Sequence, residues 1–256
     1  MQKLENRGIS FVAGRWPLDP HRNTLVFIHG ASGSSLLWRA QVDALGNRVN
    51  TVAVDLPGHG GSPGPGRERV SDYARDVLGF IDAAKVPGPI PCGLSMGGAI
   101  AQQLLLDHPA LFPAGILVST GARLRVMPQI METILSDYDG YVKSFGAFAA
   151  SEKTPPERLQ ALIEDTARCR PEIALGDFKA CDAFDVIVRL GEIAAPVLVV
   201  TAEDDKLTPP KYGKLLTEKI RGAEREHLLE AGHVLPVEQP EEFNRAVVAF
   251  LDRRGL

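Results

Sequence analysis

Hydrophobic positions in the first 120 residues alternate between two kinds of segment. Runs rich in β-branched and other apolar residues, at 24–30 and 50–58, are typical of strands buried on both faces. From Val70 to Ile81, apolar residues recur every three or four positions, as on one face of a helix. The alternation continues with a strand at 89–95, a helix at 97–108 and a strand at 114–120. This order predicts an α/β fold with a mainly parallel sheet flanked by helices.

Two other parts of the chain extend this sheet. The segment 8–16 is expected to form an antiparallel strand near one edge. After residue 190 the alternation resumes with a strand at 195–205, a helix at 209–220, a strand at 225–232 and a helix from 240. We therefore expect residues 1–120 and 191–256 to form one core domain.

The segment between these halves, 121–190, has helical patterns and no run that resembles a strand. One helix start is well marked, because Thr154 can cap the first turn, proline follows it, and Glu157 stands at the third position of the helix. Further helices are predicted at 171–184 and 184–193. An insertion of this size exceeds an ordinary loop and predicts a helical lid inserted after the sixth strand.

Composition sets limits on the class of protein. The 256 residues are 45% hydrophobic and carry a net charge of −4, which gives no reason to expect nucleic acid or an anionic membrane as a partner. No run approaches the roughly 20 apolar residues of a membrane span, and the first residues lack the layout of a signal peptide. The three cysteines are scattered and form no C-x-x-C pair. We therefore expect a cytoplasmic protein without disulfides or a metal site, and composition does not predict its oligomeric state.

A glycine-rich motif lies where a predicted strand meets a predicted helix. Gly93, Ser95 and Gly97 fit G-x-S-x-G, in which a sharp turn lifts the serine hydroxyl clear of the sheet. Side chains two residues away on either side would clash with such a turn. Because the helix begins at the serine, the amide of Met96 is a natural donor to a developing oxyanion. The motif therefore predicts a nucleophilic serine at position 95.

A serine nucleophile needs a base, and one of the six histidines has a suitable place in the chain. His233 lies in a loop after the last predicted strand, at the same edge of the sheet as Ser95. A carboxylate is expected between serine and histidine in chain order to orient the imidazole. Glu203, Asp204 and Asp205 all follow the strand at 195–205, so position alone does not choose among them.

Five segments together resemble the α/β-hydrolase superfamily, in its serine-nucleophile branch of esterases, enol-lactonases and haloperoxidases. They are VFIHG, DLPGHGGS, GLSMGG, EDDKLTP and AGHVLPVEQPEEF. In this superfamily the acid usually stands four residues before the proline of a D-x-x-x-P turn. The resemblance therefore implies that Asp205, with Pro209 closing the turn, is the acid, and Asp204 is the alternative candidate. The resemblance also implies that Ala31 donates the second oxyanion amide, and that Ser32 could add a hydroxyl.

The resemblance implies an esterase that cleaves small or medium carboxylic esters or lactones through an acyl-enzyme, without metal or organic cofactor. Thioesterase, C–C hydrolase and cofactor-free haloperoxidase or perhydrolase activities stay open as alternatives. A C–C hydrolase usually carries tryptophan after the catalytic histidine, where this chain has Val234. Two hypotheses place the protein in another functional class: a non-catalytic binding protein, and a lyase that uses the serine as a base.

Substrate-binding residues are expected in the lid and beside the predicted base. Met127, Met131, Tyr138 and Phe145 belong to an apolar set at helical spacing that fits an acyl or aromatic pocket as well as ordinary packing of lid helices. Val234 follows the predicted base directly. Arg123 opens the lid segment and could bind a substrate carboxylate, although an exposed, solvated arginine is the commoner case.

Overall fold

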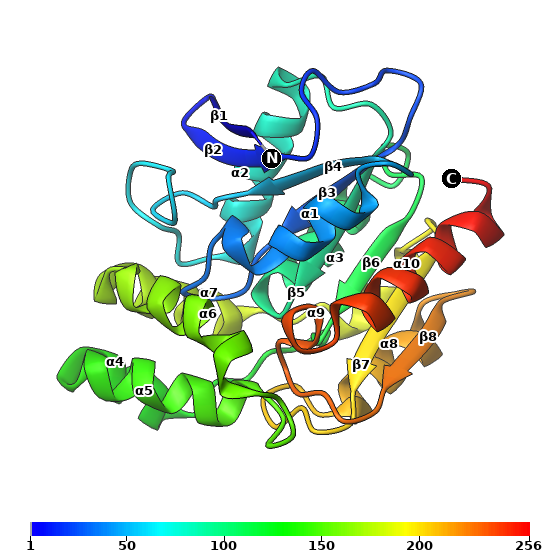
Figure 1. Cartoon of the computed structure of the whole chain (residues 1–256). Helices are drawn as coiled ribbons and strands as arrows, with labels where there is room; N and C mark the ends of the chain where they lie inside the picture. The colour runs from blue at the N-terminus through cyan, green and yellow to red at the C-terminus, as the bar shows by residue number, and fades with distance from the viewer. Residues whose placement is uncertain (1) are drawn as a thin grey trace.

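The computed structural model describes residues 2–256, so Met1, with which the predicted core begins, lies outside the described residues. Eight strands form one sheet in the order β1-β2-β4-β3-β5-β6-β7-β8 (Figure 1). Their bounds are Gln2–Asn6, Ile9–Ala13, Thr24–Ile28, Asn50–Val54, Pro89–Leu94, Gly115–Val118, Val197–Ala202 and Glu224–Leu228, for β1 to β8. The predicted α/β class with a mainly parallel sheet is confirmed.

The strands from β4 to β8 in sheet order pair in parallel, and the two N-terminal strands pair antiparallel. The strand predicted at 8–16 is β2, which joins β4. It is not itself the edge strand, because β1 forms a hairpin with it and covers its free side. The hairpin turn runs through Arg7 and Gly8, both at positive φ.

Helices cover both faces of the sheet. Alternate residues of each central strand face opposite layers, as the two-residue period of a strand requires: in β3, Val26 and Ile28 pack in one core cluster, and Leu25 and Phe27 in the other. The first cluster includes residues of α2 (Val70–Ala83), α3 (Met96–Asp107) and α8 (Pro210–Lys219). The second includes residues of the 3₁₀ helix η1 (Ser35–Trp38), α1 (Arg39–Leu45), α9 (Leu235–Glu238) and α10 (Pro240–Arg254).

Four α-helices lie between β6 and β7 in the chain and project from one end of the sheet (Figure 1). They are α4 (Pro128–Ser136), α5 (Tyr138–Ala149), α6 (Pro156–Arg168) and α7 (Pro171–Ala183). A small core of their own includes Ile134, Tyr141 and Ile173, while Leu162 of α6 and Ala180 of α7 pack into the two sheet clusters. These helices, called the inserted helices below, follow the sixth strand as predicted.

The helix predicted at 184–193 is only a short 3₁₀ helix, η2 (Ile187–Glu192). Two adjacent β-branched residues, Ile187 and Val188, followed by Gly191, give this segment low helix propensity. Its buried residue, Leu190, still packs in the first cluster, and η2 contacts α3 and α8. Within the described part of the chain, none of the helices combines the length and apolar character needed to cross a bilayer.

Candidate active site

Ser95 occupies a tight turn between β5 and α3. Its backbone angles, φ 56° and ψ −116°, lie in a region that residues with a side chain rarely adopt. The turn is held on both sides of the serine: Ser95 N–H donates to Val118 O at 3.0 Å, and Thr120 Oγ1 donates to Ser95 O at 2.8 Å. These bonds to the β6 end stabilise a conformation that the chain would otherwise avoid.

The glycines around Ser95 are required by close backbone approach. A Cβ on Gly93 would overlap the carbonyl group of Gly97. A Cβ on Gly97 would lie 2.6 Å from His29 O and also overlap Ile28 O. Both clashes are with backbone atoms, which cannot turn aside as a side chain can, so the G-x-S-x-G spacing follows from this turn.

His233 and Asp205 form a buried pair at the carboxyl end of β7 and β8. His233 Nδ1 lies 3.0 Å from Asp205 Oδ2 and 3.1 Å from Oδ1. The same carboxylate accepts from Leu207 N–H at 3.0 Å and from Thr208 N–H and Oγ1–H, each at 2.8 Å. Burial alone would raise the pKa of Asp205, but His233 and the Thr208 hydrogen bonds outweigh burial and lower it. Asp205 is therefore held as a carboxylate against the imidazole.

Asp204, the reserve candidate, has a different neighbour. Its Oδ2 accepts from Ser151 Oγ at 2.5 Å, at the end of α5, and its backbone N–H donates to Ala231 O. The geometry therefore favours Asp205 as the partner of His233, in agreement with the D-x-x-x-P spacing.

Ser95 and His233 line the same cavity, which has a volume of about 680 Å³ and lies between the sheet end and the inserted helices. In the described chain no hydrogen bond joins the Ser95 hydroxyl to the His233 imidazole. Catalytic contacts of this kind are often longer without substrate and shorten when it binds. The two groups thus share one space, with the Asp205 pair behind the imidazole.

The sequence predicts that two backbone amides, those of Ala31 and Met96, donate to an oxyanion. Ala31 lines the cavity, and Met96 begins α3 directly after Ser95. Within residues 2–256 neither N–H has a hydrogen-bond partner, so both are free to donate to a ligand. The first amides of a helix have no partner within the helix, and its dipole favours negative charge at that end.

Most of the cavity wall is apolar and comes from the inserted helices. Of the residues predicted to bind substrate, Met127, Phe145 and Val234 line it. The other large apolar lining residues are Leu37, Leu94, Ile130, Tyr141, Phe148, Leu162, Phe178 and Leu207. The wall also has polar residues, among them Thr133, Ser144 and Thr166 of the inserted helices, and Lys206, which forms an ion pair with Glu152 at 3.3 Å.

Four of the predicted binding residues are not part of this wall. Arg123 lies at the surface in an ion pair with Asp185, whose pKa it lowers. Tyr138 packs among the inserted helices and donates to Thr166 O at 3.0 Å, and Met131 likewise does not line the cavity. Ser32 is 1% exposed, and its hydroxyl bonds to Tyr141 instead of facing Ser95. The helical spacing gave no sign of which helix face turns toward the cavity.

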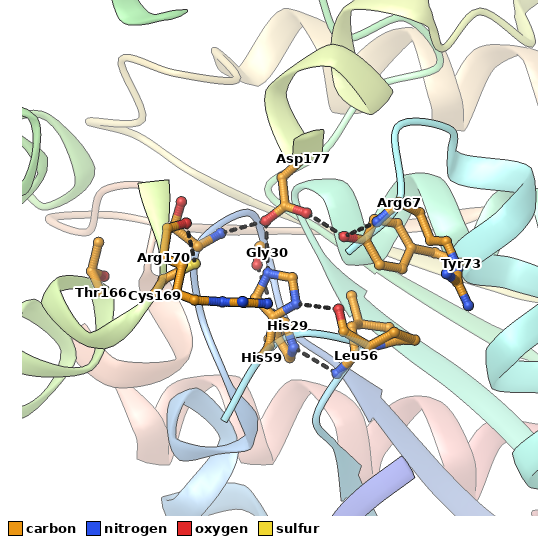
Figure 2. Close-up of polar contacts among 12 residues, drawn as sticks. His29, Gly30, Leu56, His59, Arg67, Tyr73, Thr166, Cys169, Arg170 and Asp177 are labelled. Carbon is orange, nitrogen blue, oxygen red and sulfur yellow. Dashed lines mark hydrogen bonds and ion pairs between the residues drawn. The ribbon is translucent and has the colours of Figure 1, made fainter. Parts of the chain in front are cut away.

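Sequence reasoning missed a buried polar cluster beside the cavity, drawn in Figure 2. It joins His59 of the loop after β4, Tyr73 of α2 and Asp177 of α7. The aspartate that His59 contacts lies 118 residues away, with no local motif to mark it. Within residues 2–256, no group of three or more histidine, cysteine or carboxylate side chains is arranged to hold a metal ion.

Comparison with known proteins identifies the family. Residues 25–246 match the model of the alpha/beta hydrolase family. The 3-oxoadipate enol-lactonase 2 of Acinetobacter baylyi is 30% identical over 243 residues, which cover 91% of this chain and 90% of that protein. A putative carbamate hydrolase, RutD, of Variovorax paradoxus is 30% identical over 245 residues, covering 88% and 90%. The solved structure of a thermophilic esterase superposes with a TM-score of 0.85 and 30% identity, over 99% of this chain and 98% of that one.

The chain therefore belongs to the alpha/beta hydrolase family, and it is a hydrolase. The match spans the sheet and the inserted helices alike, so the predicted resemblance is confirmed for nearly the whole chain.

Proposed function

We propose that this protein is a serine hydrolase of small to medium carboxylic esters and lactones, with Ser95 as nucleophile, His233 as base and Asp205 as the orienting acid. The observation that carries the proposal is the Ser95 turn, at φ 56°, which shares a cavity with an imidazole backed by a buried carboxylate. Relatives named as an enol-lactonase and an esterase, each 30% identical to this chain, support the same class of reaction.

The proposed mechanism uses the same groups in two half-reactions, acylation and deacylation of Ser95. His233 Nε2 takes the proton of Ser95 Oγ, which attacks the carbonyl carbon of the substrate. The amides of Ala31 and Met96 donate to the oxygen that becomes negative, each worth about 3 kcal/mol in comparable sites. His233 then gives this proton to the leaving alcohol as the ester C–O bond breaks. In the second half-reaction, His233 takes a proton from water, which attacks the acyl carbon, and returns it to Ser95 Oγ as the carboxylic acid leaves. Asp205 stays ionised and keeps the Nδ1 proton facing itself.

The cavity favours a neutral, apolar acyl group. Among the described residues, Lys206 is the one lysine or arginine of the wall, and Glu152 already pairs with it. Arg123, the predicted carboxylate binder, is engaged by Asp185 outside the cavity. A substrate carboxylate buried here would lose its hydration without gaining an ion pair. We therefore propose that esters with an uncharged acyl chain are preferred over esters or lactones with a free carboxylate.

Labelling and paired substrates test this proposal. A fluorophosphonate probe should modify Ser95 in the wild-type protein, and Ser95→Ala should lose both the label and turnover of p-nitrophenyl esters. A non-catalytic binding protein would show neither. Two p-nitrophenyl esters of equal acyl length, one ending in methyl and one in carboxylate, test the substrate class. A kcat/KM for the charged ester equal to or above that of the neutral one contradicts the preference.

A further inference from the structure

The cluster centred on Asp177 reaches the loop that carries Ala31. Asp177 of α7 is fully buried, and its carboxylate accepts three hydrogen bonds (Figure 2). Oδ2 accepts from Ser32 N–H at 2.8 Å and from His59 Nε2 at 2.8 Å, and Oδ1 accepts from Tyr73 Oη at 2.6 Å. An inserted helix is thus tied directly to the residue that follows Ala31.

The hydrogen bonds define the charge of two neighbouring imidazoles, those of His59 and His29. His59 faces acceptors on both sides, Pro57 O at 3.1 Å from Nδ1 and the Asp177 carboxylate at Nε2, which only an imidazolium satisfies. Burial alone would lower the pKa of His59, but Asp177 raises it well above the usual value. His29, whose ring centroid lies 4.9 Å away, accepts from Leu56 N–H through Nε2 and is therefore neutral. Burial, reinforced by His59, lowers the pKa of His29 to about 4.

These groups hold the two peptide units on either side of Ala31. His29 Nδ1–H donates to Gly30 O at 2.8 Å, which belongs to the same peptide unit as the Ala31 N–H. Asp177 holds the next unit through Ser32 N–H. Ser32 itself is at φ 60°, a left-handed conformation that is costly for serine. Its hydroxyl accepts from Tyr141 Oη at 3.0 Å, so a second inserted helix, α5, grips the same residue.

We infer that Asp177 and Tyr141 are positioning residues for catalysis, which hold Ser32 and thereby aim the Ala31 amide at the oxyanion. On this inference, which rests on the proposed function, the inserted helices complete the oxyanion hole in addition to covering the cavity. The contacts run without a gap: Asp177 and Tyr141 bond Ser32, and Ser32 is covalently joined to Ala31. Since Tyr141 also lines the cavity, a bound acyl group touches one of the two residues that fix the loop.

Asp177→Ala tests the inference, with Asp182→Ala as the matched control. Asp182 lies on the same helix and also accepts from a backbone amide, Val126 N–H at 3.0 Å, but away from Ala31. Asp177→Ala should lower kcat for a p-nitrophenyl ester about 10- to 100-fold, with KM changed less than about threefold, because a displaced oxyanion donor weakens the transition state. Affinity for an alkyl boronic acid, which mimics the tetrahedral intermediate, should fall by a similar factor. Asp182→Ala should leave kcat and the affinity for the boronic acid within about twofold of the wild-type values.

Two milder variants keep the test valid if Asp177→Ala does not fold. Asp177→Asn can turn its carbonyl oxygen toward Ser32 N–H and its amide toward Tyr73 Oη, so it should recover kcat to within about threefold. Tyr141→Phe removes only the bond to Ser32 Oγ, and it should lower kcat and boronic-acid affinity together, by about three- to tenfold.

The inference is wrong if folded Asp177→Ala and Tyr141→Phe bind the boronic acid as the wild type does, whatever their melting temperatures. It is also wrong if Asp182→Ala loses as much kcat as Asp177→Ala. A failure of the proposed function is separate, because it would show as turnover by Ser95→Ala that equals the wild type.

Discussion

Replacing Asp205 by asparagine tests the most specific part of the proposed site. Its Oδ1 accepts from the backbone amides of Leu207 and Thr208, so the carbonyl oxygen of an asparagine would be held at that position. The amide NH₂ would then occupy the place of Oδ2, 3.0 Å from His233 Nδ1. It can only donate there, which forces the imidazole proton onto Nε2, the atom that must accept from Ser95.

The expected decrease in kcat follows from the hydrogen bonds that Asp205→Asn would remove. Turning the amide to restore the working tautomer leaves two buried N–H groups facing an NH₂, at a cost of about 1–3 kcal/mol each. The imidazolium formed during the reaction also loses a charged hydrogen bond, worth about 1.5–3 kcal/mol. These costs sum to about 3.5–9 kcal/mol, and even the lower part of this range, about 4–6 kcal/mol, corresponds to a decrease of about 10³- to 10⁴-fold in kcat, at 1.36 kcal/mol per tenfold.

Steady-state rates with a p-nitrophenyl ester measure this effect, and Asp204→Asn is the control. Asp204 bonds to Ser151 and not to His233, so its substitution should leave kcat within about threefold. The reasoning is refuted if Asp205→Asn keeps more than about a tenth of the wild-type kcat while folded. It is refuted equally if Asp204→Asn is the more damaging change.

Three further outcomes are expected. Gly97→Ala should lower the melting temperature and abolish Ser95 labelling, because its Cβ would lie 2.6 Å from His29 O; normal labelling would contradict the turn geometry. Phe145→Ala should shift the preferred p-nitrophenyl ester to a longer acyl chain by enlarging the cavity, and an unchanged chain-length profile would contradict its place in the wall. Because the pKa of Asp205 is lower in the folded than in the unfolded state, its contribution to stability is present above about pH 4 and is lost as pH falls through the folded value. Acid unfolding should therefore depend less on pH in Asp205→Asn, and identical profiles would contradict this.

The sequence predicts the sheet and the Ser95 turn because both depend on local rules. Buried strands and amphipathic helices have their own periods, and the G-x-S-x-G spacing marks the turn within five residues. Gly93 is required by the carbonyl group of Gly97, four residues on, although Gly97 itself is required by backbone atoms of Ile28 and His29 at the end of the neighbouring strand β3. The sequence did not predict β1, η1 or α1. These elements are too short to show a long periodic pattern of apolar residues. The segment 184–193, predicted to be a full helix, has suitable apolar spacing but weak helix propensity, and it forms only a short 3₁₀ helix.

The binding wall and the Asp177 cluster could not be predicted in this way. Which face of α4 or α5 turns toward Ser95 depends on how the inserted helices pack on the sheet, so Tyr138 and Tyr141, three residues apart, have different roles. Asp177 contacts residues 104 to 145 positions away, and nothing in its own segment distinguishes it from other helical aspartates. Ser32, expected to offer its hydroxyl to substrate, is instead hydrogen-bonded to two inserted helices, because its N–H donates to Asp177 and its hydroxyl accepts from Tyr141.

Mass spectrometry of the protein quenched during turnover of a slow ester tests the central claim most directly. The account predicts that the acyl mass accumulates on the peptide containing Ser95, and that it disappears in Ser95→Ala. An acyl group found on another residue, or rapid turnover in the Ser95→Ala variant, would contradict it.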